Sequence, residues 1–170
     1  MTPAVRFAEK AGIKVGLHQY DHDPSNRHYG LEAAEALGVS PELVFKTLVL
    51  EIRTSDKSLY ALAVIPVAKT LNLKAAAAAL GYKSAMMATP TNAERVTGYI
   101  RGGISPLGTR NRLDTVLDVS SSGFSCIYCS GGKRGLDISI SSSDLVQLTN
   151  ATIAPIAKSV SYTHLRAHET

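Results

Sequence analysis

The chain has 170 residues, of which 45% are hydrophobic, 6% aromatic and 19% charged, and it carries a formal net charge of +4. This length and composition predict one soluble globular domain. No apolar run approaches the ~20 residues that a membrane-spanning helix needs, and the N-terminus lacks a signal-peptide pattern, so we expect a cytoplasmic protein with no membrane partner. The net charge allows a nucleic-acid or phosphate partner without requiring one.

The first half of the chain predicts short helices and strands. Thr2 and Pro3 are typical of a helix start, because threonine caps helices and proline is tolerated at the first helical position. Turn residues around position 56 separate two β-rich runs and indicate a hairpin. In order, we expect a helix over 4–10, a strand over 14–20, a helix over 31–37, a helical turn after 41, and strands over 44–52 and 59–66.

The second half continues the same mixture and shows no repeat. We expect a helix over 73–80 capped by Asn72, a helix over 90–96, strands over 115–119, 124–129 and 136–140, and a helix over 143–148. This order predicts an α+β fold with a mixed, largely antiparallel sheet that curls toward a barrel and is flanked by short helices. We expect residues 1–159 to form a single domain.

Residues 160–170 break from the preceding composition. The string resembles the in-frame translation of a sequencing adapter, so we exclude it from fold reasoning. His164 and His168 are four residues apart and imitate a metal site, but they belong to this segment. We therefore expect no metal site and no cofactor.

Two glycine-rich segments, 99–108 and 128–137, are the most informative feature of the chain. Each places a Gly-Gly pair beside cationic and hydroxyl side chains, and the N–H groups of such a loop can approach an anion or a carbonyl oxygen closely. Neither segment fits a P-loop or a dinucleotide-binding fingerprint. The glycines alone leave the alternative of two tight turns equally open.

Lys46 is the most unusual single residue. The strand period places it with Leu48 and Leu50 on an apolar face, where an ammonium group is costly to bury unless it is paired or used. A lysine at a strand end that extends to water is the alternative. Asp137 follows the second glycine segment and either orients a ligand amine or stabilises a turn. Tyr20 ends a strand and offers a phenol at a cleft mouth or, again, part of a turn.

No protein nucleophile can be assembled from the sequence. There is no Gly-x-Ser-x-Gly elbow, and no histidine lies near Ser105 or Ser130 in the chain. Cys126 and Cys129 form a C-x-x-C motif, but the surrounding residues predict a strand, in which residues three apart point to opposite faces. We therefore interpret both as structural thiols. An enzyme of this sequence would position and polarise its substrate.

Several motifs together resemble the YbaK/EbsC family, and most closely its bacterial YbaK type, from residue 1 to about residue 158. The motifs are Thr2-Pro-Ala-Val5, His18-x-Tyr-x-His-Asp-Pro24, Phe45-Lys-Thr-Leu48, Thr97-Gly-Tyr99, Gly102-Gly-Ile-Ser-Pro-Leu-Gly108 and Ser130-Gly-Gly-Lys-Arg-Gly-Leu-Asp137. The resemblance implies a trans-editing deacylase that clears Cys-tRNA(Pro), which prolyl-tRNA synthetase makes because cysteine and proline are similar in size. It also implies substrate-assisted chemistry, in which the cysteine thiol attacks its own ester carbonyl.

The resemblance also assigns roles to individual residues. Lys46 would hold the 3′-terminal ribose or phosphate, and the N–H groups of Gly102 and Gly103 would lie near the aminoacyl carbonyl oxygen. Tyr20 and Asp137 would fix the α-amine. The implied pocket also includes Ile104, Ser105, Ser130 and Gly131, and the implied contacts to tRNA phosphates come from Arg101, Lys133 and Arg134.

One position departs from the family pattern, since Cys129 stands where a valine is usual. Contact between Cys129 and the pocket is left open, and we expect the thiol to be inert. The implied partners are aminoacylated tRNA(Pro) and prolyl-tRNA synthetase. Two alternatives are a sister editing enzyme that prefers Ala-tRNA(Pro) and a non-catalytic module that binds tRNA or a nucleotide through the same loops.

Overall fold

The computed structural model describes residues 1–159, and the prediction for residues 160–170 lies outside this range. Two 3-10 turns, Pro41–Leu43 and Val119–Gly123, accompany the α-helices. The helices are α1 (Pro3–Lys10), α2 (Tyr29–Leu37), α3 (Leu73–Ala79), α4 (Pro90–Thr97) and α5 (Ser142–Thr149). All five lie within two residues of their predicted ends, which confirms the helix predictions.

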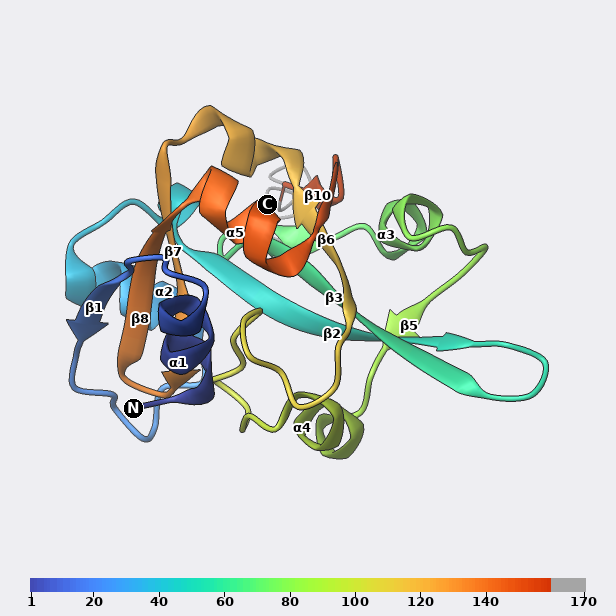
Figure 1. Ribbon diagram of the computed structural model, residues 1–170, viewed down its shortest axis with the longest axis horizontal. Coiled ribbons are helices and arrows are strands. Elements are labelled where there is room, and N and C mark those ends of the chain that lie inside the picture. Colours follow the sequence, from blue (N-terminus) through green and yellow to red (C-terminus); the bar gives the residue numbers. More distant parts are fainter. Residues whose placement is uncertain (160–170) are drawn as a thin grey trace, which may run out of the picture.

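The strands of the described range form three sheets (Figure 1). An antiparallel sheet has the order β1 (Gly16–Gln19), β8 (Leu136–Ser141), β7 (Cys126–Lys133). A mixed sheet has the order β5 (Met86–Met87), β2 (Phe45–Arg53), β3 (Ser58–Pro66), β6 (Asp114–Asp118), β9 (Thr152–Ala154). A third sheet pairs β10 (Ala157–Lys158) with β4 (Thr70–Leu71). The α+β prediction is confirmed, but none of these sheets closes on itself, so the barrel-like curl is not confirmed.

Local sequence signals account for the helix ends. The side chains of Thr2, Asn72 and Thr89 each accept a hydrogen bond from the backbone N–H three residues later, and Pro3 and Pro90 follow two of these caps. Since the first N–H groups of a helix have no partner within it, such caps fix where the helix begins. Left-handed glycines end α2 and α4, at Gly38 and Gly98.

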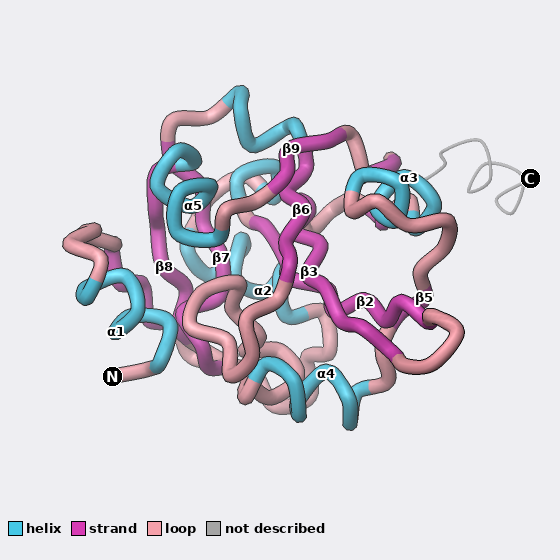
Figure 2. Tube along the Cα trace, turned by 45° about the vertical axis from the view of Figure 1, so that its right-hand side comes forward, coloured by secondary structure: helices cyan, strands magenta, loops and turns pink. Residues whose placement is uncertain are grey.

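The β2–β3 hairpin is the longest ladder of the fold, and helices cover both of its faces. Its register pairs Phe45 with Pro66 and Arg53 with Ser58. Apolar residues of α3 pack with Leu50 and Ala63 on one face, and those of α4 pack with Val49 and Leu62 on the other. Figures 1 and 2 show α3 and α4 on opposite sides of this hairpin.

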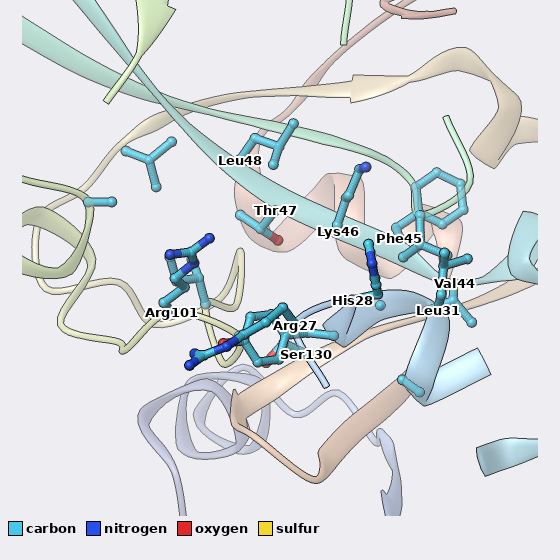
Figure 3. Close-up of a pocket in the computed structure, with 18 of the residues that line it drawn as sticks. Arg27, His28, Leu31, Val44, Phe45, Lys46, Thr47, Leu48, Arg101 and Ser130 are labelled. Atoms are coloured by element: carbon cyan, nitrogen blue, oxygen red, sulfur yellow. The ribbon is translucent and has the colours of Figure 1, made fainter. Parts of the chain in front are cut away.

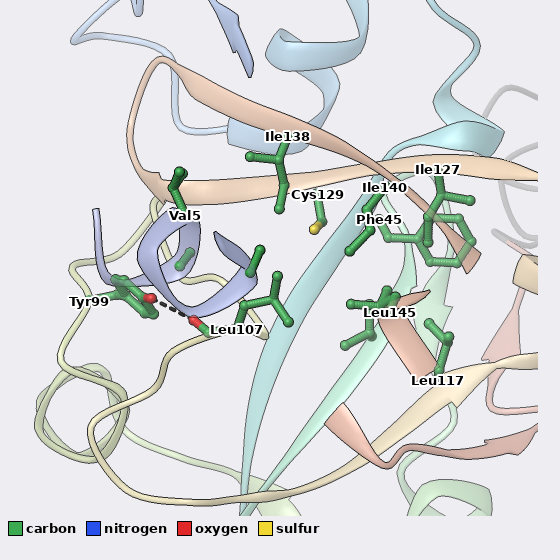
Figure 4. Close-up of a cluster of buried hydrophobic side chains, with 13 residues drawn as sticks. Val5, Phe45, Tyr99, Leu107, Leu117, Ile127, Cys129, Ile138, Ile140 and Leu145 are labelled. Atoms are coloured by element: carbon green, nitrogen blue, oxygen red, sulfur yellow. Dashed lines mark hydrogen bonds between the residues drawn. The ribbon is translucent and has the colours of Figure 1, made fainter. Parts of the chain in front are cut away.

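The main core lies between the two larger sheets, α1 and α5 (Figure 4). Its largest buried side chains include Phe45, Leu117, Ile127, Ile138 and Leu145. A β-bridge between Val44 and Tyr128 joins the start of β2 to β7, so the two sheets meet at this point. That junction also brings residues from both sheets to one cavity.

The second glycine segment differs from its prediction as a loop. Strand β7 continues through it to Lys133, with an irregular register between Ser130 and Lys133. A Cβ at Gly131 would lie 2.7 Å from the side chain of Leu136, and Gly132 has φ +105°. These positions need glycine because the strand bulges against neighbouring atoms, an effect of tertiary packing that the sequence alone does not reveal.

No helix among residues 1–159 has the length and apolar character required to cross a membrane.

Candidate functional site

A pocket of about 450 Å³ lies where the two larger sheets meet. The start of β2, the loop before α2, helix α4 and the ends of β7 and β8 surround it (Figure 3). The sequence-predicted site residues that line it are Tyr20, Lys46, Arg101, Gly102, Ile104, Ser130 and Asp137. These residues are up to 117 positions apart in the chain (137 − 20), and the fold brings them to one cavity.

Lys46 lies near the start of β2, opposite Ile65 of β3, and it is half-buried. Burial lowers the pKa of its ammonium group, because the charged form loses part of its hydration. No carboxylate in the described part of the chain forms an ion pair with it in compensation. The prediction that Lys46 lies in a strand, on the same face as Leu48 and Leu50, is confirmed. A cationic group of this kind can stabilise negative charge that develops on a bound oxygen.

Asp137 supplies a carboxyl group to the same pocket. It is paired in register with Ser130 of β7 and with His18 of β1, and its side chain is buried. Burial raises the pKa of the Asp137 carboxyl to about 7. Burial, reinforced by the charge of Asp137, also raises the pKa of Tyr20 to about 12. The pocket thus holds a neutral phenol and a carboxyl group with a raised pKa. An ammonium group bound beside this carboxyl would stabilise its ionised form.

The first glycine segment forms a tight turn at the rim of the pocket. The Gly103 N–H donates to the carbonyl oxygen of Ile100 at 2.9 Å. Gly102 has φ +85°, and a Cβ there would lie 2.7 Å from the ring of Tyr29. We expected free N–H groups at both Gly102 and Gly103. The Gly103 N–H is already used to close the turn, so only the Gly102 N–H is left for a ligand.

The other predicted site residues do not line the pocket. Ser105 is fully buried, and its hydroxyl accepts a hydrogen bond from the Leu107 N–H at 3.2 Å. The carbonyl oxygen of Gly131 accepts a hydrogen bond from the Thr2 hydroxyl, which attaches the start of α1 to β7. Outside the pocket lining are Gly103, Ser105, Gly131, Lys133 and Arg134.

Sequence reasoning gave no role to several polar residues that line the pocket, namely Arg27, His28, Tyr29, Thr47 and Glu94. The buried Thr47 hydroxyl has no hydrogen-bond partner in the part of the chain that the structure describes. Because an unsatisfied buried hydroxyl costs about 1–3 kcal/mol, it is suited to a ligand. Arg27, beside the Tyr29 hydroxyl, lowers the pKa of this phenol. The polar run before α2 was the signal available in the sequence.

The two cysteines lie on opposite sides of β7, as predicted. Cys126 is exposed, whereas Cys129 is fully buried in the main core and does not line the pocket (Figure 4). Burial strongly raises the pKa of the Cys129 thiol, so the thiolate form is disfavoured. Within residues 1–159, no group of three or more His, Cys, Asp or Glu side chains is placed to hold a metal ion.

Comparisons with known proteins find similar sequences and similar folds. A protein of Enterococcus faecalis named as a Cys-tRNA(Pro)/Cys-tRNA(Cys) deacylase, EbsC, is 37% identical over 156 residues, which are 91% of this chain and 92% of that protein. The crystal structure of a hypothetical protein shares 25% identity with a TM-score of 0.80, covering 92% of this chain and 99% of the other.

A further solved structure is described as a trans-editing enzyme for prolyl-tRNA synthetase. It matches with a TM-score of 0.76 at 23% identity, over 93% of this chain and 99% of that one, and so shares the fold. The family model for the aminoacyl-tRNA editing domain matches residues 27–148, a range that includes most of the pocket. The chain therefore belongs to the aminoacyl-tRNA editing domain family.

Proposed function

We propose that this protein is a trans-editing deacylase that cleaves the aminoacyl ester of Cys-tRNA(Pro), with the cysteine thiol of the substrate as the nucleophile. This assignment of the nucleophile rests on one observation: the described pocket residues include no activated nucleophile. The hydroxyl of Ser130 accepts a hydrogen bond from the Gly132 N–H at 3.1 Å, and no described histidine is hydrogen-bonded to it. No cysteine lines the pocket.

In the proposed reaction the substrate thiol loses its proton and its sulfur attacks the ester carbonyl carbon. The bond from that carbon to the ribose oxygen breaks, the ribose oxygen takes up a proton, and the products are a cysteine thiolactone and free tRNA. Lys46 lies beside the terminal ribose in this proposal and stabilises the charge on the leaving oxygen. Its lowered pKa makes it a better proton donor than an exposed lysine.

The remaining pocket residues hold the aminoacyl group. The carboxylate of Asp137 pairs with the substrate α-ammonium, and this ion pair stabilises the ionised form of a carboxyl group that burial otherwise keeps neutral near pH 7. The free N–H of Gly102 faces the carbonyl oxygen, while Tyr20, Ile104 and Ser130 form the walls. The Thr47 hydroxyl, which lacks a described partner, bonds to the ribose or the ester.

The tRNA body binds outside the pocket in this proposal. Arg101 lies at the rim and Lys133 is exposed beside it, so their charges are available to phosphate groups. Prolyl-tRNA synthetase is the proposed source of the substrate, the cytoplasm is the proposed compartment, and residues 1–159 form one editing domain.

A substrate series tests the proposal. Deacylation rates are measured with Cys-tRNA(Pro), Ser-tRNA(Pro) and Ala-tRNA(Pro) against buffer. We expect Cys-tRNA(Pro) to be cleaved and the serine analogue, which lacks the sulfur nucleophile, to persist. Preference for Ala-tRNA(Pro) would replace the substrate assignment. Salt-sensitive tRNA binding with no cleavage would instead support the non-catalytic binding module.

A further inference from the structure

Both polar groups of the Arg101 backbone are held by side chains from other elements. Its N–H donates to Oε2 of Glu94 in α4 at 3.0 Å. Its carbonyl oxygen accepts a hydrogen bond from Nε of Arg134, in the turn between β7 and β8, at 2.7 Å. This backbone immediately precedes Gly102, which lines the pocket.

Arg134 also reaches the glycine turn through an aromatic ring. Its guanidinium carbon lies 5.1 Å from the ring centroid of Tyr29, within the range of a cation–π contact. The same ring covers Gly102 so closely that a Cβ there would lie 2.7–2.9 Å from three ring carbons. Arg134 therefore supports the turn directly, at Arg101, and indirectly, through Tyr29.

These contacts leave Arg134 poorly available to a phosphate group. The residue is only partly exposed, one N–H donor is used by a backbone carbonyl and its guanidinium group lies over a ring. The neighbouring Lys133 is exposed and forms no hydrogen bond or ion pair with its side chain in the described part of the chain. Only a planar guanidinium can donate in its own plane and stack at the same time, so lysine cannot replace Arg134 in these contacts.

We propose that Arg134 is a positioning residue for the deacylation reaction, which fixes the Arg101–Gly102 peptide so that the Gly102 N–H points at the ester carbonyl oxygen. This inference rests on the proposed function and replaces the expectation that Arg134 binds tRNA phosphate. Loss of Arg134 then loosens a donor that acts on the transition state, so kcat falls more than KM rises.

Arg134→Lys is the decisive variant because it keeps the positive charge and removes both contacts. Lys133→Gln, at the next position, is the matched control. We expect Arg134→Lys to lower kcat for Cys-tRNA(Pro) about tenfold or more, with KM and its salt dependence unchanged. We expect Lys133→Gln to raise KM and to reduce the slope of log affinity against log salt by about one, with kcat unchanged.

A second readout is independent of activity. Amide hydrogen exchange at Gly103, whose N–H closes the turn, is expected to be faster in Arg134→Lys and unchanged in Lys133→Gln, at equal melting temperatures. A wild-type kcat in Arg134→Lys, or exchange at Gly103 as slow as in wild type, would overturn the positioning role. If wild-type protein cleaves no aminoacyl-tRNA, the proposed function fails, and exchange at Gly103 still decides whether Arg134 holds the turn.

Discussion

The backbone of Gly103 lies directly against the backbone of Lys133. A Cβ at position 103 would be 2.7 Å from the Cα of Lys133 and 3.0 Å from the N of Arg134. The two glycine-rich segments therefore pack against each other, although the sequence left open whether they were turns or parts of a site. Gly103 and Gly132 permit this packing, and of the glycines in the two segments Gly102 is the one that lines the pocket.

Gly102→Ala tests the contact between the turn and Tyr29. Gly12→Ala is the control, since Gly12 also has a positive φ but has no atom within 4 Å of its added Cβ. In both variants an alanine must adopt a left-handed backbone conformation, which costs about 1 kcal/mol of folding free energy. We expect Gly102→Ala to destabilise the fold by more than Gly12→Ala in denaturant unfolding, and Gly102→Ala alone to impair deacylation. Equal effects of the two variants on unfolding and on rate would contradict the assigned contact.

Asp137→Asn is expected to stabilise the protein, and more so at high pH. Burial raises the pKa of Asp137 from 3.8 to about 7, so the fold disfavours the carboxylate. Below pH 3.8 the group is protonated in both states and costs nothing. Between pH 3.8 and 7 the unfolded chain releases a proton that the folded chain retains, so the stability of the wild type falls as pH rises. Above pH 7 the penalty is constant.

The asparagine variant lacks this penalty. Its gain in unfolding free energy over wild type is therefore expected to grow by about 2–3 kcal/mol from pH 5 to pH 8, measured by urea denaturation at both pH values. Other titrating groups cancel in this difference. A gain that stays the same at both pH values would show that Asp137 is ionised in the fold.

Cys129→Val, which restores the usual residue of the family pattern, is expected to leave deacylation within about twofold of wild type. The thiol is fully buried among apolar side chains, and swaps that conserve volume cost less than about 1.5 kcal/mol. In native protein, alkylation followed by mass spectrometry should modify Cys126 alone. Loss of activity in Cys129→Val would mean that the thiol takes part in the reaction.

Local signals predicted more of the fold than of the site. Caps such as Asn72 and the hairpin turn around Asp56 are encoded within a few residues, and these elements form where expected. Strands of two or three residues, such as Met86–Met87, carry no periodic pattern because their partners define them. Likewise, the bulge after Ser130 depends on the side chains that pack against it.

The site shows the same division. Strand periodicity singled out Lys46, and the position after a glycine segment singled out Asp137; both line the pocket. Arg27 and Tyr29 reach it because α2 packs against Val44 and Val67, a long-range contact that no local sequence pattern predicts. The Thr47 hydroxyl becomes notable only once burial leaves it without a described partner.

The first-order rate of Cys-tRNA(Pro) deacylation, measured for wild type and Lys46→Ala in parallel, decides whether this pocket edits tRNA with the help of Lys46. Lys46 is half-buried and its charge is penalised by burial, so truncation should leave the melting temperature close to that of wild type. We expect rapid clearance of the substrate by wild type and a loss of rate on the order of 100-fold in the folded variant. A wild-type rate equal to that of buffer, or equal rates for wild type and Lys46→Ala, would contradict it.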